Sequence, residues 1–340
     1  MKSAGAALIA VLLLGLRTSE AAPLCDQIVQ VGAWNIEWLG NAKDGKRKAQ
    51  KSEDIAAYIG IAEVDVLALS EISPTSRNAS GEYQNDTLDA AFEQLNQSGA
   101  AWKYTLLPKR PGARAYYDQW TGVAWNERRV QKVGGPWRLR ATIDPDREKA
   151  IKAKFSTRQP DTIIWSRWPH AFKFSAGKGL SDFIVVPVHF KANSGRDAGP
   201  VDARKYEVDL LLEALDRGAS QFSDEDLVVL GDSNMLSANE PAAAALRAYG
   251  MKDCNAGDIG THLSSGAVGQ DAPFDRVFLI SSQPETQASC PLNGEIADPF
   301  TFTVVRPSAW LPGMGRGEFR DRLSDHQLVR VGICAIKDDD

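Results

Sequence analysis

Polar side chains that could bind a metal ion or move a proton recur beside short apolar runs along this chain. Each run is rich in β-branched residues and is typical of a β-strand. The polar residues at or near the ends of these runs are Asn35, Glu37, Glu71, His189, Lys191, Asp232, Asn234, Asp275, Asp325 and His326. Because open α/β sheets carry their sites at strand ends, we expect these side chains to converge.

The residue types indicate metal-assisted hydrolysis. Carboxylate and amide oxygens are hard ligands that suit Mg²⁺, with Mn²⁺ or Ca²⁺ as alternatives. A zinc cage is not expected, because the sequence has four histidines and no Cys-x-x-Cys pair. Histidine has a pKa near neutrality, which suits it to take a proton from attacking water, and a divalent cation neutralises a phosphodiester. We therefore expect a hydrolase that acts on phosphoric esters.

The elements that must position these residues alternate along the chain, which favours an α/β domain. The runs expected as strands cover residues 28–34, 64–69, 102–107, 121–125, 183–189, 227–230, 274–280 and 327–334. The segments expected as helices cover residues 51–59, 87–97, 201–215 and 241–248. No internal repeat or low-complexity linker interrupts this order, so the sequence predicts one domain.

The composition excludes several classes of protein. The 340 residues are 43% hydrophobic and 24% charged, which excludes a mainly disordered chain and a polytopic membrane protein. The net charge of −5 argues against an architectural DNA-binding protein, but not against an enzyme that recruits cations. Residues 128–158 nevertheless hold ten lysines and arginines against three acidic residues. This basic stretch is either a surface for a phosphate backbone or a solvated loop, and both readings stay open.

The first 22 residues resemble a secretory signal peptide. Lys2 precedes an apolar run over residues 6–16, and small residues follow at 19–22, where cleavage is expected. A retained N-terminal anchor is the alternative. We therefore expect residues 23–340 to form the domain and to be secreted, into the medium or the periplasm. Four cysteines, Cys25, Cys254, Cys290 and Cys334, would then meet an oxidising compartment, which suggests two disulfides with the pairing open.

Six short motifs in a fixed order give the chain a family resemblance. They are Trp-Asn-Ile-Glu-Trp (34–38), Ala-Leu-Ser-Glu-Ile (68–72), Val-His-Phe-Lys (188–191), Gly-Asp-Ser-Asn (231–234), Phe-Asp-Arg-Val (274–277) and Ser-Asp-His (324–326). From about Ile28 to Cys334 the chain resembles the endonuclease/exonuclease/phosphatase superfamily, in particular its bacterial secreted nucleases. The resemblance implies a deoxyribonuclease-I-like four-layer sandwich, with two packed mixed β-sheets flanked by helices. It also places the first and last strands together, which favours a Cys25–Cys334 disulfide and leaves Cys254–Cys290 as the second pair.

The resemblance also implies a role for each site residue. The implied metal ligands are Glu71, Asn35, Asp325 and Asp232. The implied catalytic residues are His326, His189, Asp275, Asp232, Asn234 and Asp118. The implied substrate-binding residues are Arg167, Thr261, Asn35 and Lys191. Two positions depart from the family pattern: Ser70 stands where glutamine is common, and Ser233 stands where an aromatic residue is common.

The resemblance leaves the phosphate ester open, and several features favour nucleic acid. The Ser-Arg-Trp-Pro motif at 166–169 is similar to that of the deoxyribonuclease branch, and the basic stretch could follow a backbone. We expect a monomeric, sequence-nonspecific endonuclease acting on DNA or RNA, without stable membrane association. The first alternative is a sphingomyelinase-like lipid phosphodiesterase, for which residues 309–316 would form an exposed apolar hairpin. The second is a nuclease-like binding or toxin subunit without turnover.

Overall fold

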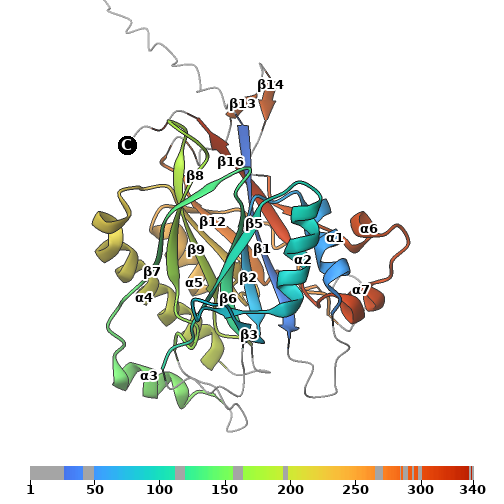
Figure 1. Ribbon diagram of the computed structural model, residues 1–340. Coiled ribbons are helices and arrows are strands. Elements are labelled where there is room, and N and C mark those ends of the chain that lie inside the picture. Colours follow the sequence, from blue (N-terminus) through green and yellow to red (C-terminus); the bar gives the residue numbers. More distant parts are fainter. Residues whose placement is uncertain are drawn as a thin grey trace, which may run out of the picture.

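The computed structural model describes residues 27–40, 50–111, 119–155, 164–193, 198–264, 271–283, 285, 290–292, 295–297, 301–336 and 338. Two mixed β-sheets form the centre of this described part (Figure 1). The first sheet has the strand order β15 (Thr303–Val304), β16 (Val329–Ala335), β1 (Gln27–Leu39), β2 (Val66–Ile72), β6 (Trp120–Asn126), β5 (Trp102–Leu107). The second has the order β11 (Met251–Asp253), β12 (Asp275–Ile280), β10 (Leu227–Asp232), β9 (Asp182–His189), β8 (His170–Ser175), β7 (Gln131–Arg138). Two small hairpins pair β3 (Ser76–Arg77) with β4 (Tyr83–Gln84), and β13 (Cys290–Leu292) with β14 (Glu295–Ala297).

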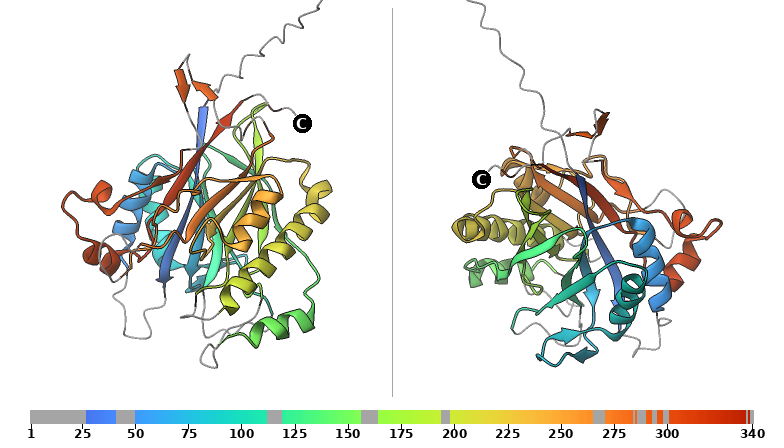
Figure 2. Two further views of the ribbon diagram at one scale, coloured as in Figure 1. Left: turned by 180° about the vertical axis from the view of Figure 1, so that it is seen from behind. Right: turned by 45° about the horizontal axis from the view of Figure 1, so that its top comes forward.

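Helices cover the outer faces of the two sheets, as Figures 1 and 2 show. Over the first sheet lie α1 (Ser52–Ala62), α2 (Asp86–Gln97), α6 (Pro307–Trp310) and α7 (Arg316–Arg322). Over the second lie α3 (Pro145–Lys152), α4 (Gly199–Phe222) and α5 (Pro241–Ala248). A third apolar layer fills the space between the sheets. The expected four-layer sandwich is therefore confirmed.

The central strands show why the sequence folds into layers. In β10 every residue is buried, and the side chains alternate between two apolar layers. Val228 and Leu230 pack between the sheets, whereas Leu227 and Val229 pack under the helices. A strand that is covered on both faces needs a continuous apolar run, and this is why Leu-Val-Val-Leu shows no polar alternation.

Strand register brings the motifs to one end of the sandwich. β1 pairs in parallel with β2, so that Asn35 lies opposite Ser70, next to Glu71. β10 lies between β9 and β12, so that Asp232 is opposite both His189 and Asp275. β1 also pairs antiparallel with β16 over its first half, which confirms that the first and last strands are neighbours.

The basic stretch forms an edge strand and a short helix. β7 is the edge strand of the second sheet, and α3 begins where the Asp144 side chain accepts hydrogen bonds from two backbone amides. The sequence reading expected neither element. The longest expected helix, 201–215, is present and extends over Gly199–Phe222 as α4. No described helix has the length and apolar character that a membrane span requires.

The cysteine predictions have different outcomes. Cys334 is buried in β16 and is disulfide-bonded. Cys25 and the side chain of Cys290 lie outside the described residues, so the Cys25–Cys334 pairing stays a prediction. Cys254 carries a thiol and packs against the apolar layer between the sheets, so the predicted Cys254–Cys290 disulfide is wrong. The expected signal peptide, residues 1–22, also lies outside the described part.

Candidate active site

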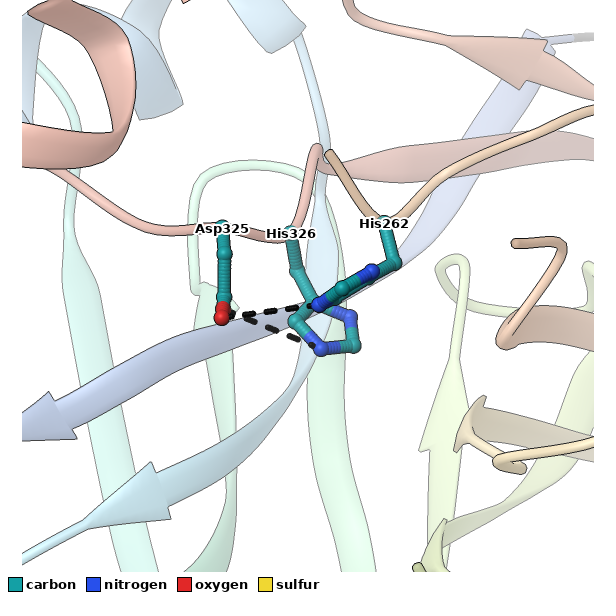
Figure 3. Close-up of side chains that lie close together, drawn as sticks. All are labelled: His262, Asp325 and His326. Atoms are coloured by element: carbon teal, nitrogen blue, oxygen red, sulfur yellow. Dashed lines mark ion pairs between the residues drawn. The ribbon is translucent and has the colours of Figure 1, made fainter. Parts of the chain in front are cut away.

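The segment just before β16 brings an acid and a base into the site (Figure 3). Ser324 fixes its position, because its hydroxyl donates to the Asn35 carbonyl at 2.6 Å and accepts from the His326 amide at 2.9 Å. The Trp34 indole nitrogen donates to the His326 carbonyl at 3.1 Å. The Trp-Asn and Ser-Asp-His motifs, almost three hundred residues apart in sequence, therefore hold one another in place.

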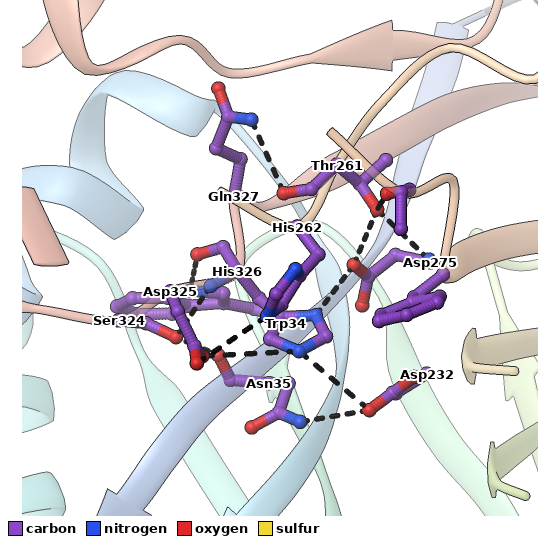
Figure 4. Close-up of polar contacts among 12 residues, drawn as sticks. Trp34, Asn35, Asp232, Thr261, His262, Asp275, Ser324, Asp325, His326 and Gln327 are labelled. Atoms are coloured by element: carbon purple, nitrogen blue, oxygen red, sulfur yellow. Dashed lines mark hydrogen bonds and ion pairs between the residues drawn. The ribbon is translucent and has the colours of Figure 1, made fainter. Parts of the chain in front are cut away.

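Asn35 and His326 both contact Asp232 (Figure 4). The Asn35 amide Nδ2 donates to Asp232 Oδ2 at 2.9 Å. The Nε2 atoms of His189 and His326 lie 3.4 Å and 3.9 Å from the same oxygen. His189 Nε2 is also 3.9 Å from Glu71 Oε1. The structure thus brings together five residues that sequence reasoning placed in one site.

A buried hydrogen-bonded chain orients the His326 ring. Its Nδ1 lies 2.8 Å from Asp275 Oδ2, and the Thr261 hydroxyl donates to that same oxygen at 2.7 Å. The Asp275 amide in turn donates to the Thr261 oxygen at 3.0 Å. Asp275 and Thr261 are fully buried. With Nδ1 bonded to a carboxylate, the ring presents Nε2 to the site. The two hydrogen bonds with Thr261 therefore fix the position of the Asp275 carboxylate.

Several site residues adopt left-handed backbone conformations where their strands end. The φ angles are 36° at Glu37, 62° at Glu71 and 54° at Asn234. Such conformations are unfavourable for side chains other than glycine, and they cluster at functional sites where the surroundings enforce them. At Asn234 the enforcing contacts are visible: its amide donates to Asp232 Oδ1 at 3.0 Å, and its Nδ2 donates to the Phe190 carbonyl at 3.2 Å.

Of the four predicted substrate-binding residues, Arg167 and Lys191 lie at the edge of the cluster. Asn35 lies within it, and Thr261 is fully buried behind Asp275, where it supports that carboxylate. The Arg167 guanidinium donates hydrogen bonds to the backbone carbonyl and the side-chain oxygen of Gln119. Its positive charge acts to lower the pKa values of Glu71 and His189. Lys191 is buried, and its backbone amide donates to Glu207 Oε2 at 2.8 Å. Asp118 lies outside the described residues, and its role stays a prediction.

Sequence reasoning missed His262. Its Nε2 lies 3.5 Å from Asp325 Oδ2, and its ring meets the His326 ring edge-on with centroids 4.8 Å apart. No strand-end motif marks this residue. It reaches the site because the backbone at His262 forms an isolated antiparallel bridge with His326. The only available signal was its position next to Thr261, which the family resemblance had already placed in the site.

The pKa values of the site carboxylates are shifted in different directions: those of Asp232 and Glu71 are raised, and that of Asp325 is lowered. Burial raises the pKa of Asp232 to about 6, although the His326 charge opposes this shift. Burial also raises the pKa of Glu71, against the Arg167 charge and a hydrogen bond from Asn35. For Asp325, burial would raise the pKa, but the hydrogen bond with His262 and the His326 charge outweigh it and hold the pKa below its ordinary value.

The two histidines beside Asp232 are shifted in opposite directions. Burial, reinforced by the Arg167 charge, holds the pKa of His189 well below its ordinary value. Burial would also lower the pKa of His326, but the Asp275 and Asp232 carboxylates outweigh it and hold that pKa well above the ordinary value. His189 is therefore neutral over a wider pH range than His326, and His326 can act as a base only after it loses the proton that the two carboxylates favour.

The donor set fits a hard divalent cation. Glu71, Asp232 and Asp325 supply carboxylate oxygens, and Asn35 supplies an amide oxygen whose bond from the Glu37 amide leaves one lone pair available. Burying several carboxylates together is costly, as the raised pKa values of Glu71 and Asp232 show. A cation among them would offset that cost. These residues could therefore hold a metal ion of the Mg²⁺ type.

Comparison with known proteins supports the fold assignment. No protein-family profile and no curated protein matches the sequence. Among solved structures, the chain is similar to a conserved protein of unknown function from Enterococcus faecalis, with a TM-score of 0.57 at 14% identity over 90% of this chain and 100% of that one. It is also similar to an endonuclease/exonuclease/phosphatase from Bacteroides vulgatus, with a TM-score of 0.55 at 14% identity over 90% and 98% of the two chains. A third match is the D. rerio TDP2 complexed with single-strand DNA product, with a TM-score of 0.53 at 14% identity over 91% and 99%.

These matches confirm the resemblance at the level of the fold. The chain has the deoxyribonuclease-I-like fold that is found in endonuclease/exonuclease/phosphatase proteins. Since all three identities are 14%, the roles of individual side chains follow from the geometry of this chain and not from the matches.

Proposed function

We propose that the chain is a secreted, divalent-metal-dependent phosphodiesterase that cleaves nucleic acid as a sequence-nonspecific endonuclease. The observation that carries this proposal is the convergence on Asp232 of Asn35, His189 and His326, with Asp275 bound behind His326. A nucleophile-activating base, an orienting carboxylate and a set of oxygen ligands are what phosphodiester hydrolysis requires. Export rests on the signal-peptide pattern of residues 1–22.

In the proposed mechanism, His326 takes the proton of the attacking water at Nε2. Asp275 keeps the Nδ1 proton in place and stabilises the imidazolium that forms, as the carboxylate of a hydrolase triad does. Glu71, Asn35, Asp325 and Asp232 would hold the divalent cation, which supplies positive charge against the phosphate and the leaving oxygen when it is bound.

His189 also contacts Asp232 and is proposed to donate a hydrogen bond from Nε2 to the leaving oxygen. Its Nε2 faces the carboxylates of Asp232 and Glu71, whereas its Nδ1 has no hydrogen-bond partner among the described residues. This favours the neutral tautomer with the proton on Nε2. From there the ring can stabilise the charge on the leaving oxygen by a hydrogen bond, and that oxygen takes its proton from solvent. Arg167 adds a fixed positive charge for the phosphate at the edge of the site.

A basic groove whose lining includes Trp168, the neighbour of Arg167 in the sequence, supports nucleic acid as the substrate. The groove has a volume of about 770 Å³ and lies between the edge strand β7 and the helix α4. Arg138, Arg140 and Arg217 line it, and no acidic side chain does so among the described residues. The Arg138 guanidinium carbon lies 4.2 Å from the centroid of the Trp168 ring. Trp168 directly follows Arg167 in the sequence. Arginines and an aromatic face are the groups that follow a sugar–phosphate strand and its bases.

The packing of residues 309–316 does not favour the lipid alternative, which needs these residues to form an exposed apolar hairpin. The Trp310 ring packs edge-on against Tyr58 and Phe319, with centroids 6.2 Å and 6.3 Å away. Met314 is buried, and only Leu311 of the three apolar side chains is exposed. The segment over residues 309–316 thus forms part of the core around α1, which favours turn packing over an apolar hairpin for a membrane.

The test is a substrate panel on the mature protein with Mg²⁺ and with EDTA. The panel contains supercoiled plasmid, single-stranded RNA, and vesicles with sphingomyelin. The proposal expects nicked plasmid or cut RNA that disappears with EDTA, and intact sphingomyelin. Sphingomyelin cleavage alone would move the assignment to lipid phosphodiesterases. Tight nucleic-acid binding without turnover on any ester would favour the binding-subunit hypothesis.

A further inference from the structure

His262, Asp325 and His326 place two imidazoles and a carboxylate around one point (Figure 3). Asp325 Oδ2 is 3.5 Å from His262 Nε2, and Asp325 Oδ1 is 3.9 Å from His326 Nε2. One donor atom from each residue lies within 4.8 Å of the others. Donor atoms around a tetrahedral zinc ion at 2.0–2.2 Å are roughly 3.3–3.6 Å apart. His262 and Asp325 already have this spacing, and the His326 nitrogen must move closer to them for all three to bind one ion.

The backbone and the neighbouring side chains hold this cluster in place. Besides the bridge between His262 and His326, the Leu263 amide donates to the Asp325 carbonyl at 2.6 Å. The His262 ring also lies against Phe274, with centroids 5.0 Å apart. At His326 the ligand position is Nε2, because Nδ1 is bonded to Asp275. A ligating histidine usually has such a carboxylate behind it, and this contact fixes the ring and its tautomer.

We propose that His262, Asp325 and His326 form a binding site for a nitrogen-preferring transition-metal ion, of which Zn²⁺ is the representative. Two imidazoles and one carboxylate suit Zn²⁺ or Co²⁺, and leave a fourth position open. This set shares Asp325 with the proposed Mg²⁺ ligands, but its other donors are two histidine nitrogens. The nearby carboxylates of Asp232 and Asp275 add negative charge that favours a dication here.

The consequence for activity rests on the proposed function. An ion in this site engages His326 Nε2, the atom proposed to take the proton from water, and engages Asp325, a proposed Mg²⁺ ligand. Zn²⁺ is therefore expected to inhibit the Mg²⁺-dependent reaction. The site itself does not depend on the reaction, and metal binding measures it directly.

The experiment titrates EDTA-treated, dialysed mature protein with Co²⁺ and follows the visible absorption of the ion. A four-coordinate site with nitrogen ligands absorbs far more strongly than a six-coordinate oxygen site. Because His189 could also bind Co²⁺ with Glu71 and Asp232, a variant of each histidine assigns the signal to one cluster. Zn²⁺ is then added to displace Co²⁺. His262→Gln is compared with His189→Gln, which changes a neighbouring histidine outside the cluster, and thermal melts confirm that both variants fold.

The proposal expects intense absorption that Zn²⁺ abolishes in the wild type and in His189→Gln. In His262→Gln the apparent affinity should fall at least about tenfold, since even the loss of an outer contact costs this much. Equal Co²⁺ spectra and affinities in His262→Gln and the wild type would overturn the site. In plasmid assays, each protein's rate with Zn²⁺ is divided by its own rate with Mg²⁺ alone. The Zn²⁺ concentration for half inhibition should then be higher for His262→Gln than for the wild type. Absence of any nuclease activity would refute the proposed function, but the Co²⁺ titration would still decide this site.

Discussion

Replacing Asp275 by asparagine isolates the contribution of the carboxylate behind His326. The substitution keeps the shape of the side chain and removes its charge, while Asp275 is fully buried and 2.8 Å from His326 Nδ1. A hydrogen bond to a charged group contributes about 1.5–3 kcal/mol. The attraction between unit charges 4 Å apart is about 4 kcal/mol at an effective dielectric constant of 20. These two figures describe one interaction, so the loss in the transition state is about 3–4 kcal/mol.

That loss corresponds to a fall in kcat/KM of roughly 10²–10³-fold, because each 1.36 kcal/mol is a factor of ten. The assay is the initial rate of plasmid nicking with Mg²⁺, measured from pH 5 to pH 9. Since the carboxylate raises the pKa of His326, the profile of Asp275→Asn should move to lower pH. A change that only loosened the fold would lower the rate without moving the profile.

Thr261→Val is the graded control for this experiment. It removes one neutral hydrogen bond to Asp275, worth about 0.5–1.5 kcal/mol, and should reduce kcat/KM by no more than about tenfold. Thermal melts should show both variants folded at the assay temperature. If folded Asp275→Asn keeps its rate within threefold of the wild type with an unmoved pH profile, the assignment of Asp275 and His326 as a pair is refuted.

Three further predictions concern the metal ligands, the groove and the stability of the fold. Glu71→Gln removes a carboxylate from the proposed Mg²⁺ position, and the Mg²⁺ concentration for half-maximal nicking should rise at least about tenfold; an unchanged Mg²⁺ dependence would exclude Glu71 as a ligand. Arg138→Glu should weaken DNA binding and flatten the plot of log K against log salt concentration, by about 0.9 in slope per lost phosphate contact, as measured by fluorescence anisotropy. Lys103→Glu makes the same charge change on β5 outside the groove, so an equal effect there would mean that the groove has no special role. Burial and a hydrogen bond with Asp182 raise the pKa of Asp224 to about 8, so the folded state keeps a proton between about pH 4 and pH 8 that the unfolded chain has lost. The free energy of unfolding should therefore fall as pH rises through this range, and urea titrations of Asp224→Asn should show a smaller decline; a decline as large as in the wild type would contradict the reasoning.

Strand-end motifs made most of the site predictable from the sequence. The run Leu-Val-Val-Leu before Asp232 is long enough to identify a strand covered on both faces, and the polar residues after it mark where that strand ends. The same reasoning placed Asn35, His189 and His326 correctly in one cluster. Local periodicity identifies such strands because burial on both faces leaves no room for polar alternation.

Contacts that depend on loop geometry were not predictable in this way. His262 reaches His326 through one isolated bridge between two segments without repeating structure, and no local pattern encodes that contact. The Cys254–Cys290 pairing was predicted as the pair left over after Cys25–Cys334, whereas Cys254 packs as a thiol against the layer between the sheets. The helix α3 was missed because its charged residues hide its apolar face, although the Asp-Pro at 144–145 is a helix-start signal.

Plasmid nicking by His326→Ala tests the central claim most directly, because His326 is the side chain through which Asp275, Asp232 and the proposed water meet. The wild type and the folded variant are incubated with supercoiled plasmid and Mg²⁺, and EDTA is added to parallel samples. The proposed role predicts nicking by the wild type that EDTA abolishes, and a rate at least about 10²-fold lower in the variant. Nicking by His326→Ala at the wild-type rate, or nicking that persists with EDTA, would contradict a metal-dependent phosphodiesterase centre built on this histidine.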